Sequence, residues 1–119
     1  MYIRLARSCM AGSDLYTGTL DLLVLKALSW GPMHGYAINK WIRERTAEAV
    51  MVSEGSLYPA LHRLERRGLL SEEWGVTDRG REAKYYSLTA AGRAHLRAEA
   101  ERFTSHAATV AAVLALRRA

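Results

Sequence analysis

A proline stands in the middle of a segment whose apolar residues otherwise follow helical spacing. The segment SEGSLYPALHRLERRGLL covers residues 53–70, and its leucines recur on one helical face at Leu57, Leu61 and Leu64. Proline lacks a backbone N–H and clashes with the carbonyl four residues earlier, so a helix tolerates it only near its start. A helix must therefore begin just upstream of Pro59, where Ser53 or Ser56 offers an N-cap hydroxyl, and Gly68 is placed to end it.

Two further helices are predicted before this one. Residues 17–32, TGTLDLLVLKALSWGP, form a dense apolar run that stops at Gly31 and Pro32, which predicts a mostly buried helix. Residues 34–49, HGYAINKWIRERTAEA, carry apolar side chains on one helical face and charged side chains on the other. This second pattern predicts an amphipathic helix.

The periodicity changes after Gly68 from that of a helix to that of strands. Residues 70–88 contain two short extended runs around a polar centre at residues 77–80, which predicts a β-hairpin with a loop longer than two residues. Thr89 is placed to cap a final helix. Along that helix, apolar residues are separated alternately by four and three positions, which makes a heptad seam at Leu96, Ala100, Phe103, Ala107, Val110 and Leu114.

Three helices, a hairpin and a long helix predict a mainly α-helical winged helix-turn-helix with a small antiparallel β-hairpin. In this arrangement the third helix, from Ser53 to Arg67, enters the major groove of DNA, and the hairpin lies along the backbone or the minor groove. The expected organisation is a loose extension at residues 1–16, a DNA-binding domain at 17–88 and a dimerisation helix at 89–119. The seam is longer than a small domain can bury internally, which predicts a homodimer.

The net charge of +5 favours an anionic partner, because lysine and arginine neutralise phosphates and release counterions. The distribution of that charge weakens the argument. Residues 53–88, which hold the expected recognition helix and hairpin, contain six basic and six acidic residues. Residues 89–119 contain five arginines against two glutamates. Bulk charge alone therefore gives weak support for DNA binding.

Other classes of protein find little support in the sequence. No apolar run approaches the roughly 20 residues of a membrane-spanning helix. The single cysteine, Cys9, excludes an intrachain disulfide and a cysteine-based zinc site. The histidines show no metal-ligand spacing and no glycine-rich loop follows a strand, so no metal, cofactor or catalytic residue is predicted. We expect a soluble, cytoplasmic protein without enzymatic activity.

Several motifs occur together in an order that is typical of one family. The segments GTLDLLVLKAL, GPMHGYAI, SEGSLYPALHRLERRGLL, EEW and KYYSLTAAGRAHL resemble the PadR family of bacterial transcriptional regulators over about residues 17–116. The single C-terminal helix resembles the short subfamily. The resemblance implies a winged helix whose last helix makes a dimer and whose dimer binds double-stranded operator DNA, usually as a repressor. Two-fold symmetry then implies a palindromic operator.

The resemblance also implies which residues contact DNA. The start of the third helix matches the family's recognition helix, Tyr36 matches a contact to a backbone phosphate, and the hairpin matches the wing. The expected contacts are Gly35, Tyr36, Ser53, Gly55, Ser56, Tyr58, His62, Arg63, Arg79, Arg81, Lys84 and Tyr86. Two acidic residues near the wing tip, Asp78 and Glu82, leave the contribution of the wing open.

Several aromatic positions also allow a purely structural interpretation. Tyr58 either packs beside Pro59 or reaches DNA. Trp30 and Trp41 favour the core over a ligand platform, and Trp74 is able to clamp the hairpin onto the helices. Phe103 would meet its symmetry mate near a two-fold axis, where core packing is the favoured role.

A small aromatic effector is a further partner that the resemblance implies. Family members that bind drugs or phenols use aromatic groups around the dimer interface, which makes Phe103 and Trp30 the candidate contacts. The alternative function is that of a protein-interaction adaptor. Winged helices serve that role too, and residues 53–88, which would contact DNA, carry no net charge. Salt-dependent binding to free DNA separates the two.

Overall fold

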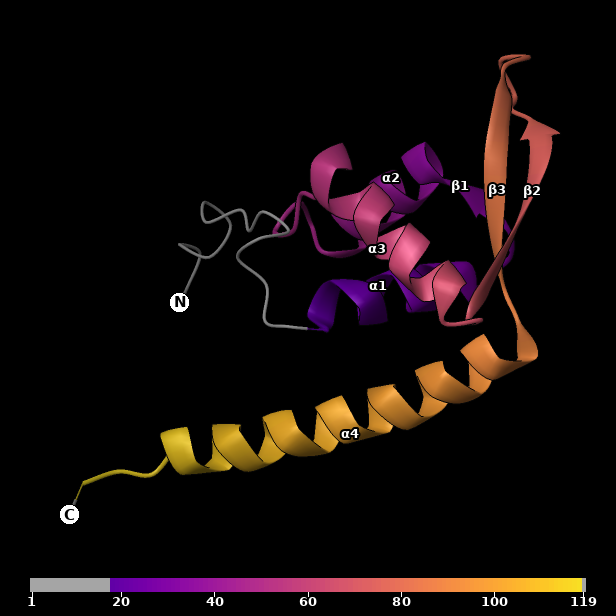
Figure 1. The fold of residues 1–119 in the computed structure, drawn as a ribbon. Helices are drawn as coiled ribbons and strands as arrows, with labels where there is room; N and C mark the ends of the chain where they lie inside the picture. Colours follow the sequence, from indigo (N-terminus) through magenta and orange to yellow (C-terminus); the bar gives the residue numbers. More distant parts are fainter. Residues whose placement is uncertain (1–17, 119) are drawn as a thin grey trace.

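The computed structural model describes residues 18–118, so the expected extension at residues 1–16 lies outside the described residues. The elements follow one another along the chain as shown in Figure 1. In order they are α1 (Thr19–Leu28), β1 (Met33–His34), α2 (Gly35–Arg45), α3 (Glu54–Arg66), β2 (Leu70–Val76), β3 (Glu82–Leu88) and α4 (Ala90–Leu114). This order confirms the predicted fold of three helices, a β-hairpin and a long last helix.

The hydrophobic core lies between α1, α2, α3 and the base of the hairpin. The three leucines that share one face of α3, Leu57, Leu61 and Leu64, are at most 1% exposed. Leu70 and Leu88, which face each other across the hairpin, close the core from the other side. Trp41 packs partly buried against this core, which confirms its predicted structural role.

The start of α3 is capped as the sequence predicts. The Ser53 hydroxyl accepts a hydrogen bond from the backbone N–H of Ser56 at 3.2 Å. Pro59, however, is the sixth residue of the helix and lies in its second turn rather than its first. The carbonyl that loses its i+4 donor belongs to Gly55, which is exposed, so water can solvate it and the helix continues.

The sheet has three strands rather than the two predicted, with the order β1-β3-β2 and antiparallel pairing throughout. β1 has only two residues, Met33 and His34, which is too short for an alternating pattern. The hairpin itself is confirmed, and its loop is closed by a hydrogen bond from the Thr77 N–H to the Arg81 carbonyl at 2.8 Å. Gly80 in this loop takes a positive φ of 78°, which glycine adopts at little cost.

Helix α4 begins at the predicted cap, where the Thr89 hydroxyl accepts a hydrogen bond from the Gly92 N–H at 3.0 Å. Figure 1 shows the helix leaving the hairpin and extending beneath α1. Leu96, predicted as the first residue of the seam, instead packs partly buried against the core of its own protomer. From residue 101 to 118 every side chain is exposed. Within residues 18–118 no helix combines the length and apolarity needed to cross a membrane.

Candidate nucleic-acid interface

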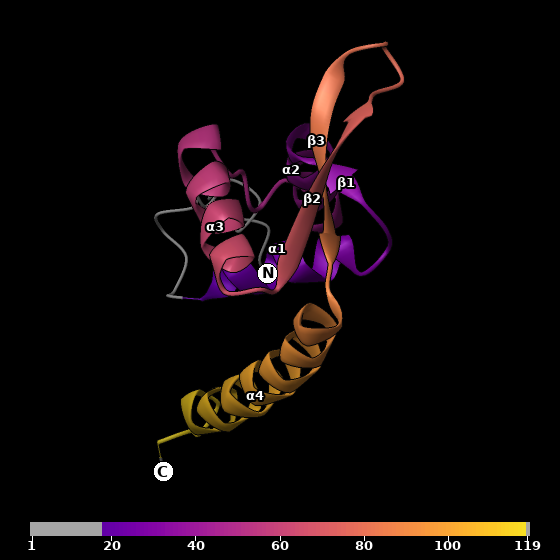
Figure 2. The ribbon, with the colours of Figure 1, turned by 45° about the vertical axis from the view of Figure 1, so that its right-hand side comes forward.

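The N-terminus of α2, one side of α3 and the outer half of the hairpin border a groove of about 970 Å³. Figure 2 shows α3 on one side of the domain and the hairpin on the other. Residues of α2 and α3 supply one wall. The hairpin loop and β3 supply the other wall.

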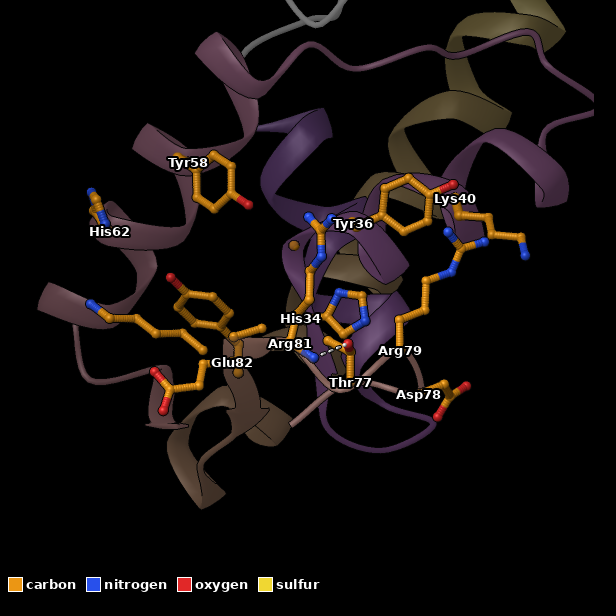
Figure 3. Close-up of a pocket in the computed structure, with 14 residues that line it drawn as sticks. His34, Tyr36, Lys40, Tyr58, His62, Thr77, Asp78, Arg79, Arg81 and Glu82 are labelled. Atoms are coloured by element: carbon orange, nitrogen blue, oxygen red, sulfur yellow. Dashed lines mark hydrogen bonds between the residues drawn. The ribbon is translucent and has the colours of Figure 1, made fainter. Parts of the chain in front are cut away.

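This groove brings together most of the residues that were predicted to contact DNA. Those that line it are Gly35 and Tyr36 from α2, Tyr58 and His62 from α3, and Arg79, Arg81, Lys84 and Tyr86 from the wing. Figure 3 shows Tyr58 and His62 on the α3 side and Tyr36 and the two arginines across from them. Residues from three separate elements therefore converge on one surface.

Two predicted contacts have another role in the structure. Tyr86 borders the groove, but only 2% of its surface is exposed, and burial raises the pKa of its hydroxyl. The prediction that Tyr86 contacts DNA is therefore corrected, and Tyr86 is a core residue beneath the groove. Arg63 points away from the groove toward α1, where its guanidinium donates to the Asp21 carboxylate at 2.6 Å. Its charge is compensated within the protein, and the prediction that Arg63 contacts DNA stays a prediction.

The remaining predicted contacts lie at the N-terminus of α3, beyond the lining of the groove. Ser53 and Gly55 are exposed there, and Ser56 is partly exposed. The side chains of the two serines hydrogen-bond each other at 3.3 Å. This end of a helix carries free N–H groups and the positive end of the helix dipole, both of which favour an anion.

The groove also contains residues that sequence reasoning missed. Lys40 lies one helical turn after Tyr36, so the spacing of i and i+4 on α2 would have identified it. His34 was not singled out because its place depends on tertiary structure. It caps α2 by accepting a hydrogen bond from the Ala37 N–H at 3.3 Å, and its ring meets Tyr85 edge to face at 5.3 Å.

The cations of the groove differ in whether they are already paired. Among residues 18–118, Lys40, Arg79 and Arg81 take part in no ion pair. Lys84, in contrast, places its ammonium 3.0 Å from a carboxylate oxygen of Glu72. Asp78 and Glu82 also line the groove. Three unpaired positive charges at fixed places on α2 and the wing tip make this surface suitable for a polyanion.

The carboxyl groups of Glu65 on α3 and Glu72 on the wing influence each other's pKa. The hydrogen bond to Glu72 and, after it, burial raise the pKa of Glu65. The hydrogen bonds from Glu65 and Lys84 lower the pKa of Glu72. Lys84 has a raised pKa because its ammonium donates to Glu72. Glu72 is thus the carboxylate that pairs with Lys84.

Tyr58 both lines the groove and packs against the N-terminus of α2. A Cβ placed on Gly35 would overlap the Tyr58 hydroxyl and lie 2.8 Å from the adjoining ring carbon. Replacing Gly35 by alanine is therefore expected to displace the Tyr58 ring while changing the melting temperature little, because the obstructing atoms end a side chain that can rotate. NMR shifts of the Tyr58 ring and a thermal unfolding curve check this prediction, and an unmoved ring would contradict it.

The aromatic residues considered for an effector lie outside the groove. Trp30, in the turn after α1, is 70% exposed, so the prediction that it belongs to the core is wrong. Phe103 on α4 is 46% exposed. Trp74 is also exposed and does not clamp the hairpin onto the helices; its ring lies 5.6 Å from the Lys84 ammonium. Within residues 18–118, no cluster of three or more metal-binding side chains occurs.

The fold agrees with comparisons to known proteins. The model of a family described as "Transcriptional regulator PadR-like family" matches residues 24–98. The crystal structure of a PadR family transcriptional regulator from Eggerthella lenta is similar with a TM-score of 0.72 and 32% identity, over 84% of this chain and 85% of that one.

Two proteins similar in sequence come from other bacteria. A protein of Lysinibacillus sphaericus is 32% identical over 73% of this chain and 80% of its own length. A transcriptional regulator of Mycobacterium tuberculosis is 49% identical to this chain. The aligned segment covers 47% of this chain and 52% of that protein.

Proposed function

We propose, from its membership of the PadR-like family of transcriptional regulators, that the chain is a homodimeric, sequence-specific DNA-binding repressor. The chain belongs to this family, whose members are regulators and not enzymes. In this proposal α3 enters the major groove of an operator and the hairpin contacts the adjacent backbone. A small molecule or another signal releases the protein from the operator. The observation that carries the proposal is the convergence on the groove beside α3 of Lys40, Arg79 and Arg81, which form no ion pair within residues 18–118.

The contacts of the groove fall into two classes. Arg79, Arg81 and Lys40 are the proposed phosphate contacts, which fix the position of the protein but carry no sequence information directly. Tyr58 and His62, on the exposed side of α3, are the proposed contacts to base edges, because a major groove about 12 Å wide admits a helix and its side chains. Tyr36 at the start of α2 is a further phosphate contact in this proposal.

The proposed dimer rests on the outer part of α4. Phe103, Ala107, Val110 and Leu114 continue the heptad seam where every side chain is exposed in the single chain, and Ala100 lies at its inner end. Pairing two copies along this seam would remove that apolar surface from water. It would also relate two recognition helices by a two-fold axis, which suits a palindromic operator with half-sites roughly 34 to 36 Å apart.

Removing the outer part of α4 is expected to abolish the dimer. A protein truncated after Arg97 keeps the part of α4 that packs on the core and loses all of the exposed seam from Ala100 onward. Sedimentation equilibrium is expected to show a monomer, while circular dichroism retains the signal of a folded domain. A truncated protein that sediments as a dimer would refute the assignment of the seam.

The binding partner is tested by titrating the protein against its own upstream promoter fragment and against a scrambled duplex, at two salt concentrations. Preferential binding to the promoter that weakens steeply with salt would support an autoregulating repressor, because each neutralised phosphate contributes about −0.9 to the slope. Equal affinity for the two duplexes, unchanged between the two salt concentrations, would contradict the proposal and favour the protein-interaction adaptor.

The effector is the least constrained part of the proposal. Phe103 would lie beside its symmetry mate in the dimer, and the exposed ring of Trp30 offers a second aromatic surface. A small aromatic molecule is the class of ligand that both would bind, by stacking and by burial of apolar area. Release of promoter DNA upon adding aromatic acids or planar drugs is the expected sign of such an effector.

A further inference from the structure

Lys84 differs from the other lysines and arginines of the groove because its charge is already satisfied. Its ammonium lies 3.0 Å from Glu72 and 5.6 Å from the centre of the Trp74 ring. Trp74 is directly opposite Lys84 in the hairpin and Glu72 is opposite Tyr86, so these side chains share one face of the wing. The Lys84 ammonium is therefore held in place by the strand next to its own.

Glu72 is also affected by ionisable groups of α3. Its pKa is lowered by Glu65 of α3 and by Lys84. The ionisable groups that act on Glu72 are Glu65 and His62 from α3 and Lys84 from β3. Of these groups, Lys84 is the one whose charged atom lies in direct contact with the Glu72 carboxylate, at 3.0 Å.

A phosphate that approaches Lys84 meets competition from this carboxylate. The phosphate must displace Glu72 from the Lys84 ammonium. It then lies near the Glu72 carboxylate, whose negative charge is no longer paired. The same approach to Arg79 or Arg81 displaces no ion pair. The pair is partly exposed, with 38% of the Lys84 side chain and 27% of the Glu72 side chain accessible, so it can exchange when a duplex is held firmly by other contacts.

We propose that Glu72 is a specificity-determining residue that withholds Lys84 from the phosphates of DNA of arbitrary sequence. This inference rests on the proposed function, because it assumes that the groove binds DNA. On a non-cognate duplex, where no base contacts fix the register, Lys84 stays with Glu72 and contributes nothing to affinity. On the operator, where base contacts set the register, a phosphate placed beside Lys84 displaces Glu72.

The expected effect follows from counterion release. Replacing Glu72 by glutamine keeps the shape of the side chain but frees Lys84 to neutralise one more phosphate in each protomer. Per protomer, the slope of log affinity against log salt on random-sequence duplex becomes steeper by about 0.9, and affinity at about 0.1 M salt rises by up to about eightfold. Affinity for the promoter rises less, so the ratio of specific to non-specific binding falls.

Glu73→Gln is the matched control. Glu73 is the next residue on the same strand, is exposed, and lies opposite Tyr85 on the other face of the hairpin. The two substitutions change the net charge equally and close to the same place, so a difference between them reports the contact with Lys84 rather than the general field of the protein.

The experiment measures fluorescence anisotropy of a labelled random-sequence duplex over a series of salt concentrations. The proteins are the wild type, Glu72→Gln, Glu73→Gln, Lys84→Ala and the double variant Glu72→Gln/Lys84→Ala, each with a thermal unfolding curve to show that it is folded. We expect the gain in affinity and slope in Glu72→Gln alone, and its loss in the double variant.

Three results would overturn the inference. Equal behaviour of Glu72→Gln and Glu73→Gln would show that only net charge matters. A gain that persists without Lys84 would show that Glu72 repels DNA by itself. Weaker binding by Glu72→Gln would show that Glu72 orients Lys84 for DNA rather than withholding it. A wild-type protein that binds no duplex at low salt would instead refute the proposed function, so the two failures are distinguishable.

Discussion

Replacing Gly92 by alanine is expected to destabilise the protein, although alanine is the better helix former. Gly92 lies in the first turn of α4, and a Cβ at this position would overlap the carbonyl oxygen of Leu69 and lie 3.1 Å from its carbon. The obstructing atoms belong to backbone and cannot rotate away, in contrast to the Tyr58 ring beside Gly35. The first turn of α4 must therefore move as a body.

That movement breaks the junction between α4 and the winged helix. The Thr89 N–H donates to the Leu69 carbonyl at 3.1 Å, and the Thr89 hydroxyl donates to the Gly68 carbonyl at 2.7 Å. Overpacking of this kind costs roughly 1 to 3 kcal/mol, whereas helix propensity alone would stabilise the alanine variant by about 1 kcal/mol. We expect the packing cost to prevail.

Thermal unfolding decides between these two opposing effects. The melting temperature of Gly92→Ala is expected to fall by roughly 5 to 10 °C. Ser105→Ala, at an exposed position of the same helix, is the control and is expected to leave the melting temperature unchanged or slightly raised. A melting temperature of Gly92→Ala above that of the wild type would show that the junction relaxes without cost.

Removing Arg79 and Arg81 together is expected to abolish measurable DNA binding at moderate salt. Both guanidinium groups line the groove, and neither takes part in an ion pair among residues 18–118. A dimer without them would lose four phosphate contacts, which makes the salt slope shallower by about 3.6. At about 0.1 M salt this corresponds to a loss of affinity on the order of a thousandfold.

Arg66→Ala/Arg67→Ala is the control for this prediction. These two arginines lie at the C-terminal end of α3, are exposed and do not line the groove, yet their removal changes the net charge by the same amount. We expect a small loss of affinity and a nearly unchanged slope. Equal losses in the two double variants, measured by titrating promoter DNA at several salt concentrations, would show that the groove is not the binding surface.

The sequence contained enough local information to predict the four helices, the hairpin and their order, but not the two-residue strand β1. The Ser53 and Thr89 caps, the leucines of α3 and the polar loop of the hairpin each act through neighbours a few residues away, so each could be read from spacing alone. The position of Pro59 within α3 was predicted less well. Whether the helix tolerates a proline in its second turn depends on whether water can solvate the Gly55 carbonyl, which has lost its hydrogen-bond donor.

The sequence did not reveal contacts and exposure that arise only in the packed chain. Arg63 is paired with Asp21, which is 42 positions away in the chain. Tyr86 was expected to reach DNA from the returning wing strand, but it is only 2% exposed. Trp30 is apolar and follows a buried helix, yet the turn after α1 carries it into solvent.

The sequence by itself therefore determined the winged-helix fold, the resemblance to a family of regulators and the heptad seam, because periodicity, caps and turns are short-range properties of the chain. Only the tertiary structure decided which charges of the groove are free. That distinction separates Arg79 and Arg81 from Arg63 and Lys84, since the ion pairs that neutralise the latter two join different elements. Short-range interactions select the elements, whereas electrostatic availability depends on distances that exist only after those elements have packed.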